Sequence, residues 1–227
     1  MAIIDISGPI TTGMWHYGRP YLDLPVPPVS IKQIDFPEPL KGQLIMEYMQ
    51  MSSQTGTYLE TARHVYAHRE SIDVVPVERV WMVPTVVLHT PRDAGGKVTL
   101  EDVKRSLSEQ QVTIDQGDAV LIHTGWDREW NNARRYLTEM PYIAREVVLW
   151  LMDQKISVWG VDTPRADSPE DPQNFFGDLF KTDILLLAPV VNLAEVTRST
   201  PKPRLVALPL KLDGACASPV RAVLVTE

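Results

Sequence analysis

The chain has 227 residues, a formal net charge of -7 and one cysteine, with 44% hydrophobic and 22% charged residues. This composition is typical of a globular protein with a sizeable core. The negative charge and the lack of any basic run exclude a nucleic-acid surface. A single cysteine excludes an intrachain disulfide and a zinc site built from cysteines, so we expect Cys216 to be a small buried filler.

The N-terminal residues MAIIDISGPI have no positive segment and no long apolar core, which argues against a signal peptide. No apolar run along the chain reaches membrane-spanning length. We therefore expect a cytoplasmic protein without a membrane partner.

The first predicted element is a strand over residues 2–6, which Gly8 and Pro9 end. From about residue 13 to residue 40 the chain carries six prolines, a density that forbids a helix. This stretch predicts an extended N-terminal arm. The arm either wraps a partner subunit or lies on the surface as a loop.

Further strands are predicted where β-branched or leucine-rich runs are bounded by Gly, Pro, Asp or Asn. These runs cover residues 44–51, 83–90, 119–124, 157–161, 184–187, 205–210 and 222–225. Helices are predicted over residues 99–109, 141–154 and 172–182, the first of them opening with Thr99 as N-cap. The pattern indicates one α/β domain over residues 1–227, built around a mixed sheet.

The segment of residues 54–64 reads QTGTYLETARH. It resembles the signature His-x-Gly-Thr-His-x-Asp-x-Pro-x-His of the cyclase family, the kynurenine formamidase-like metal hydrolases with isatin hydrolase and polyketide cyclase relatives. The positions of Gly56, Thr57 and His64 keep the register of that signature. The two earlier histidines, the aspartate and the proline are replaced by Gln54, Tyr58, Glu60 and Ala62.

Four more segments resemble blocks of the same family in the same order. They are residues 4–10 (IDISGPI), 117–126 (GDAVLIHTGW), 160–167 (GVDTPRAD) and 217–222 (ASPVRA). The resemblance implies a swivelling β/β/α domain with a mixed β-sheet flanked by helices, and a homodimer or homotetramer. The family also has a late histidine and glutamate. Alignment on Asn192 and Leu193 puts Phe176 near that histidine and Ala188 at that glutamate.

The resemblance implies a zinc or manganese ion held by the first two histidines and the aspartate, with the last histidine in catalysis or as a further ligand. In this chain Tyr58 offers a phenol, whose pKa near 10 makes it a poor ligand at neutral pH. The amide of Gln54 is a neutral, weak donor. We therefore predict that no metal is bound and that no cofactor is used.

The replacements keep a polar set with a possible chemistry of its own. If the segment is extended, residues 54, 58 and 60 lie on one face. We predict that Tyr58 donates a hydrogen bond to a substrate carbonyl and that His64 moves a proton, oriented by Glu60. An ion pair of Glu60 with Arg63 or Arg69 is the competing interpretation.

Substrate contacts are predicted for Gln54, Trp15, Tyr17 and Phe176. For Trp15 and Tyr17 ordinary packing of the arm is an equal alternative. In place of a ligand, Phe176 would form a pocket wall that suits an apolar or aromatic substrate.

Several other residues of the family blocks are expected to be structural. We interpret Asp162 and Asp167 as scaffold and Trp126 as core. His89 and His123 end two predicted strands, and packing explains them better than metal binding does.

The favoured function is a metal-independent enzyme that cyclises, dehydrates or isomerises a small carbonyl metabolite, aromatic or polyketide-like, in secondary metabolism. A general acid and a general base can catalyse these reactions without a metal, whereas amide hydrolysis in this family depends on a metal that generates hydroxide. A hydrolase of an amide, lactone or lactam, with a metal site rebuilt from Gln54, Glu60 and His64, is one alternative. A catalytically silent protein that binds a small ligand or partner is another. A kynurenine-pathway role is not expected, because formamidase activity in the family depends on the intact ligands.

Overall fold

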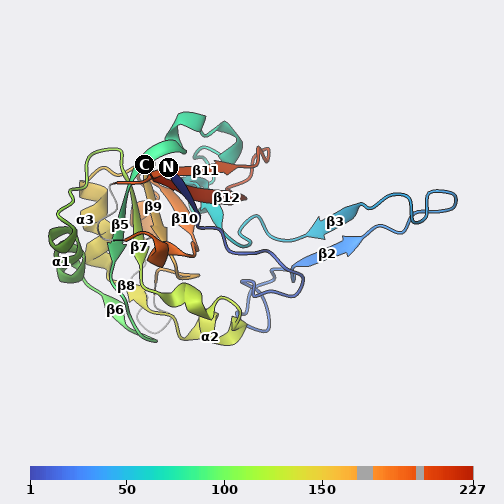
Figure 1. The fold of residues 1–227 in the computed structure, drawn as a ribbon, viewed down its shortest axis with the longest axis horizontal. Coiled ribbons are helices and arrows are strands. Elements are labelled where there is room, and N and C mark those ends of the chain that lie inside the picture. The colour runs from blue at the N-terminus through green and yellow to red at the C-terminus, as the bar shows by residue number, and fades with distance from the viewer. Residues whose placement is uncertain (168–175, 198–201, 227) are drawn as a thin grey trace.

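The computed structural model describes residues 1–167, 176–197 and 202–226. Its main strands are β1 (Ala2–Asp5), β4 (Tyr58–Glu60), β5 (Trp81–His89), β7 (Ala119–His123), β9 (Val158–Val161), β10 (Leu185–Ala188), β11 (Arg204–Pro209) and β12 (Ala217–Thr226). They form one sheet in the order β1-β12-β11-β5-β7-β9-β10-β4, and β12 pairs with β4 as well. That last pairing closes seven strands into a barrel, and β1 pairs with the C-terminal part of β12 (Figure 1).

The barrel is mixed, as the sequence predicts. Strands β5, β7, β9 and β10 run parallel, whereas β4, β11 and β12 pair antiparallel with their neighbours. The expected architecture, a sheet flanked by helices, is therefore correct in part. The sheet is closed, because β4 joins β10 to β12 through three residue pairs on each side.

Helices α1 (Leu100–Gln110) and α3 (Arg145–Asp153) pack side by side outside the parallel strands (Figure 1). Helix α1 begins at a capping box in which Thr99 and Asp102 satisfy each other's backbone amides. The described residues also form two short helices, α2 (Ala133–Thr138) and α4 (Phe176–Leu179). The 3₁₀ turns are η1 (Ala62–His64), η2 (Ile72–Val74), η3 (Val77–Arg79), η4 (Trp126–Glu129) and η5 (Leu193–Glu195).

Successive side chains of a strand point to opposite faces of the sheet, so the strands contribute to two hydrophobic cores, one on each face. In β7, Val120 and Ile122 pack under the helices, whereas Ala119 and Leu121 fill the barrel. Gly160 of β9 also faces the interior, where an added Cβ would lie 2.5 Å from the Leu121 side chain. The outer face is therefore available for a site wherever no helix covers it.

Most predicted elements are present with shifted ends. The strand expected at residues 222–225 begins at Ala217, and the strand expected at residues 44–51 is only Glu47–Gln50 (β3). The helix expected from residue 141 begins at Arg145, because Tyr142–Ile143 (β8) pairs with Lys97–Val98 (β6). Of the helix expected at residues 172–182, the first four residues lie outside the described ranges and Phe176–Leu179 is helical.

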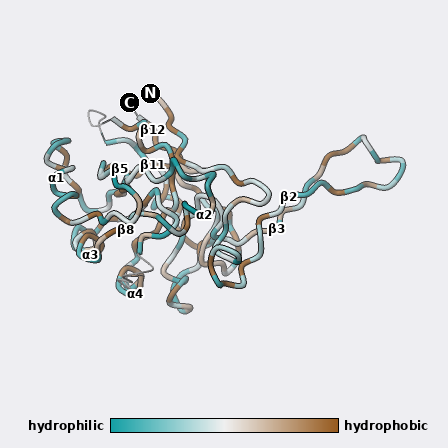
Figure 2. The backbone as a smooth tube through the Cα atoms, turned by 90° about the horizontal axis from the view of Figure 1, so that it is seen from below, coloured by the Kyte–Doolittle hydropathy of each residue, from teal (hydrophilic) through white to brown (hydrophobic). Residues whose placement is uncertain are grey.

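The proline-rich N-terminal stretch has two parts in the structure. Its first part lies beside the body of the protein, and its second part enters a hairpin of β2 (Ser30–Gln33) and β3 that projects far from the barrel (Figures 1 and 2). Within the described ranges, no helix is both long and apolar enough to cross a bilayer.

Candidate functional site

The site lies on the outer face of β4, on the side away from the barrel interior. Leu59 points into the barrel core, so Tyr58 and Glu60 on either side of it point outward. Opposite them in the ladder are Ala188 and Leu186 of β10. The register of β4 and β10 thus places the polar side chains of Tyr58 and Glu60 beside two apolar ones.

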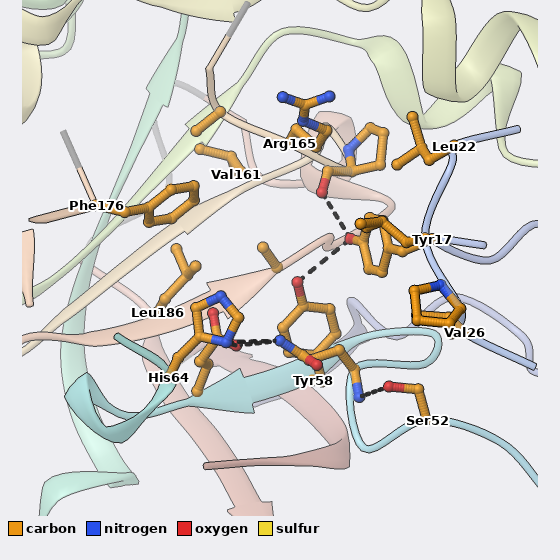
Figure 3. A pocket seen from close by; sticks show the side chains of 17 residues that line it. Tyr17, Leu22, Val26, Ser52, Tyr58, His64, Val161, Arg165, Phe176 and Leu186 are labelled. Atoms are coloured by element: carbon orange, nitrogen blue, oxygen red, sulfur yellow. Dashed lines mark hydrogen bonds and ion pairs between the residues drawn. The ribbon is translucent and has the colours of Figure 1, made fainter. Parts of the chain in front are cut away.

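These residues line a cavity of about 620 Å³ (Figure 3). One wall comes from the N-terminal segment, with Leu22, Leu24 and Val26. Its other apolar residues include Val161 at the end of β9 and Phe176 at the start of α4. The cavity therefore combines apolar walls with a small polar cluster, as small-molecule sites commonly do.

The polar cluster consists of Gln54, Glu60 and His64. The Gln54 Nε2 atom donates to Glu60 Oε1 at 2.6 Å and lies 3.0 Å from His64 Nδ1. The distance from Glu60 Oε1 to His64 Nδ1 is 3.2 Å (Figure 3). Thr61 begins the η1 turn by accepting a hydrogen bond from the Arg63 amide, and the same turn carries His64 to the cluster.

Burial controls the charges of this cluster. It raises the pKa of Glu60 from 4.5 to about 8, against the opposing effect of the Gln54 hydrogen bond. Burial also lowers the pKa of His64 below its usual value of 6.5. Both shifts favour the uncharged forms, a protonated Glu60 and a neutral His64, at neutral pH.

Two tyrosines form the opposite side of the polar region. The Tyr17 hydroxyl donates to the Pro164 carbonyl at 2.6 Å and lies 3.3 Å from the Tyr58 hydroxyl (Figure 3). Burial raises the pKa of both phenols, so both stay neutral. Because the Tyr17 proton is engaged by Pro164, the Tyr58 proton is directed either to the Tyr17 oxygen or to a ligand.

Trp15 occupies a different place from the one expected for a substrate contact. It is 2% exposed and packs edge-on against Tyr17 and Trp130, with ring centroids 5.7 and 5.0 Å away. It is not among the residues that line the cavity, so its position agrees with the alternative of packing in the arm, where it supports Tyr17.

The two positions aligned with the family's late histidine and glutamate both lie at the cavity. Both Phe176 and Ala188 lie on its wall. Phe176 also stacks on Phe180 with centroids 5.8 Å apart. An aromatic ring and a methyl group thus occupy these two wall positions.

Two residues at the site were missed from the sequence. Arg165 lines the cavity at a position where the family block has serine, and that departure was the available signal. Cys216 is half-buried, where a buried filler was expected, and its sulfur lies within 4.8 Å of ligand atoms of Glu60 and His64. Burial and the Glu60 carboxylate raise the pKa of its thiol.

The donor set of Gln54, Glu60 and His64 fits a divalent metal ion. It offers one carboxylate oxygen, one imidazole nitrogen and one amide group, whose oxygen and nitrogen can be exchanged by a flip. Atoms that share one zinc ion lie about 3–4 Å apart, and the ligand atoms of Glu60 and His64 lie 3.2 Å apart. The chain therefore retains the means to hold a metal, although the family's two earlier histidines are absent.

The competing interpretation of Glu60 as an ion-pair partner of arginine is wrong. The Arg63 guanidinium donates to the carbonyls of Ala67 and Gly214. The Arg69 guanidinium pairs with Asp183. Neither arginine neutralises the Glu60 carboxyl group.

The structure gives contacts for several residues expected to be structural. The Asp162 carboxylate is fully buried and accepts from the amides of Thr124 and Gly125 at 2.8 and 2.7 Å. Burial raises the pKa of Asp162 to about 7. His89 and His123 face each other, with 3.0 Å between their Nδ1 atoms, at a separate small cavity.

Comparison with known proteins agrees with this architecture. The family model "Cyclase", described as "Putative cyclase", matches residues 4–168. Kynurenine formamidase of Bacillus cereus is 25% identical over 226 residues, covering 97% of this chain and 96% of that protein. Isatin hydrolase of Roseibium aggregatum is 22% identical over 236 residues, covering 93% and 89%. The structure of isatin hydrolase A from Ralstonia solanacearum superposes with a TM-score of 0.86 at 19% identity, covering 100% of this chain and 92% of that one. Because the family model spans most of the chain, the protein belongs to the cyclase family.

Proposed function

We propose that the protein hydrolyses a small amide, lactam or lactone in the cavity beside β4, with a divalent metal bound at the cluster of Gln54, Glu60 and His64. The observation that carries the proposal is the convergence of these three polar groups within 3.2 Å of one another. The names of the relatives, kynurenine formamidase and isatin hydrolase, support hydrolytic chemistry. This proposal reverses the preference for a metal-independent reaction drawn from the sequence.

A divalent metal bound at this cluster supplies a Lewis acid for the carbonyl group and acidifies a bound water. The chain itself supplies the hydrogen bonds. Tyr58 stays neutral and can turn its proton from the Tyr17 oxygen toward a carbonyl oxygen that gains negative charge. The apolar walls from Leu22 and Phe176 limit access of bulk water to the reacting group.

The cavity also restricts the class of substrate. A volume of about 620 Å³ suits a small ring system, and Phe176 and Leu186 offer apolar surface to it. Arg165 adds a positive charge to the lining, which suits a substrate or product with a carboxylate group. Small aromatic lactams and N-acyl aromatic acids therefore fit best.

The test is hydrolysis of a panel of isatins, aryl formamides and aryl lactones by the purified protein, before and after treatment with a chelator. We expect activity to fall on chelation and to return with zinc or manganese. The variant Tyr58→Phe should keep its metal and lose about 10²–10³ in kcat. The variant Glu78→Gln, at an exposed carboxylate outside the cavity lining, is the control and should keep kcat. Activity that survives complete removal of metal would contradict the proposal.

A second candidate is the metal-independent acid–base reaction on a carbonyl compound. It is favoured by the pair of a protonated Glu60 and a neutral His64, 3.2 Å apart, which can act as acid and base without a metal. It predicts turnover of a cyclisation, dehydration or isomerisation substrate that chelation does not affect. Tight binding without any turnover would instead indicate a catalytically silent protein.

We also propose that the projecting hairpin joins subunits of a homodimer or homotetramer. Its apolar side chains include Ile45, Met46 and Met49, which are 79%, 52% and 63% exposed in the single chain. A two-stranded hairpin is marginally stable alone in water, so these side chains require a partner surface. Analytical ultracentrifugation should show a dimer or tetramer for the wild type and a smaller species for Ile45→Lys. A wild-type monomer would contradict this assembly.

A further inference from the structure

Beside the three polar groups lies a fourth group whose chemistry the family signature does not contain. The Cys216 sulfur and ligand atoms of Glu60 and His64 all lie within 4.8 Å of one another. The three residues come from segments far apart in the sequence. Cys216 directly precedes β12, Glu60 ends β4, and His64 ends η1.

The backbone holds these three positions in register. Ala217, next to Cys216, pairs with Glu60 in the antiparallel ladder of β12 and β4. The Cys216 carbonyl accepts from the Thr61 amide at 2.9 Å, and the Thr61 hydroxyl lies 3.2 Å from the same oxygen. Because Thr61 also begins the turn that carries His64, one residue fixes the thiol relative to the imidazole. Ligands mounted on such elements are pre-positioned for one ion.

We propose that Cys216 binds the metal as a thiolate together with Glu60 and His64, and that the metal is zinc. This inference rests on the proposed presence of a metal in the cavity. A set of one sulfur, one nitrogen and one oxygen ligand matches catalytic zinc sites, which use three protein ligands and keep one position open. Thiolate ligands favour zinc over manganese, which prefers oxygen.

The position of Gln54 agrees with this set. Its amide is the weakest donor of the cluster and contacts both Glu60 and His64. With Cys216 as the third strong ligand, Gln54 orients two ligands by hydrogen bonds and leaves the open position to water or substrate. The thiol proton is released to solvent when zinc binds.

The test uses cobalt as an optical probe of the full-length protein, because thiolate-to-cobalt charge transfer gives a near-ultraviolet band. The chain has one cysteine, so such a band can come only from Cys216. We expect one cobalt per chain with this band, loss of the band in Cys216→Ser, and a zinc affinity lowered at least about 100-fold in that variant. Zinc should also protect the wild-type thiol from a thiol reagent.

Controls separate ligand loss from misfolding. The metal-free Cys216→Ser protein should match the metal-free wild type in circular dichroism and urea midpoint, and Leu24→Ala should keep the cobalt band. Cys216→Asp, which restores an anionic ligand, should recover part of the zinc affinity without the band.

The outcomes distinguish this inference from the proposed function. Stoichiometric cobalt without a thiolate band, and equal zinc affinity in Cys216→Ser, would overturn the inference while leaving metal-dependent hydrolysis intact. A thiolate band with no hydrolysis of any substrate would overturn the proposed function alone. Absence of bound metal in the wild type would overturn both the inference and the proposed metal-dependent function.

Discussion

The buried carboxyl group of Glu60 makes the stability of the metal-free protein depend on pH. Its pKa rises from 4.5 to about 8 through burial, and its side chain is almost completely inaccessible. Between these values the folded protein keeps a proton that the unfolded chain releases, so the free energy of unfolding falls as pH rises. At about 1.4 kcal/mol per pKa unit, the loss is about 3 kcal/mol at pH 7 and about 5 kcal/mol above pH 8.

Urea unfolding of metal-free wild type and Glu60→Gln at several pH values measures this loss. The glutamine amide can still accept from Gln54, but it does not titrate. Relative to the variant, the wild type should lose about 1.4 kcal/mol per pH unit from about pH 4.5 to about pH 8, and then no more. Glu78→Gln, at an exposed carboxylate, is the control and should follow the wild type. Added zinc should remove most of the slope, because it binds the ionised form. Equal slopes in wild type and Glu60→Gln would refute the reasoning.

Three more predictions concern single residues. Arg165→Gln should lower kcat/KM about tenfold or more for substrates with a carboxylate and leave neutral analogues unchanged; equal effects on both classes would exclude charge recognition. Asp162→Ala should lower the free energy of unfolding by about 3–5 kcal/mol, because buried amides lose their acceptor. A loss below about 1 kcal/mol in urea unfolding would show that water replaces the carboxylate. Gly160→Ala should cost about 1–3 kcal/mol, because its Cβ would lie 2.8 Å from the Leu187 carbonyl; an unchanged urea midpoint would contradict this crowding.

The part of the site that the sequence located lies in one short stretch. Tyr58 and Glu60 alternate with Leu59 on β4, as an extended backbone predicts. Gln54 joins them through a bend, not an extended strand, because Gly56 has a φ of 66°. The turn after β4 adds His64 with no long-range contact required. Local geometry was therefore sufficient to group these four residues.

The missed parts depend on contacts between distant segments. Strand β4 has three residues, too few for a recognisable alternation, so its pairing with β12 and the closure of the barrel left no pattern in the sequence. Cys216 reaches the cluster only through that pairing. The sequence left two alternatives open for Trp15, because an aromatic residue in a core and one in a pocket wall look alike in a sequence.

The three residues of β4 face two different environments, the packed barrel interior and the cavity. Leu59 packs in the barrel interior, where its size and shape are restricted, whereas its neighbours Tyr58 and Glu60 project into the cavity. Changes at the outward positions can alter the chemistry without repacking the interior, which explains how one scaffold tolerates a rewritten ligand set. The same property makes the protein suitable for engineering: Gln54→His, Tyr58→His and Glu60→Asp together would place the two histidines and the aspartate of the family signature on an unchanged barrel.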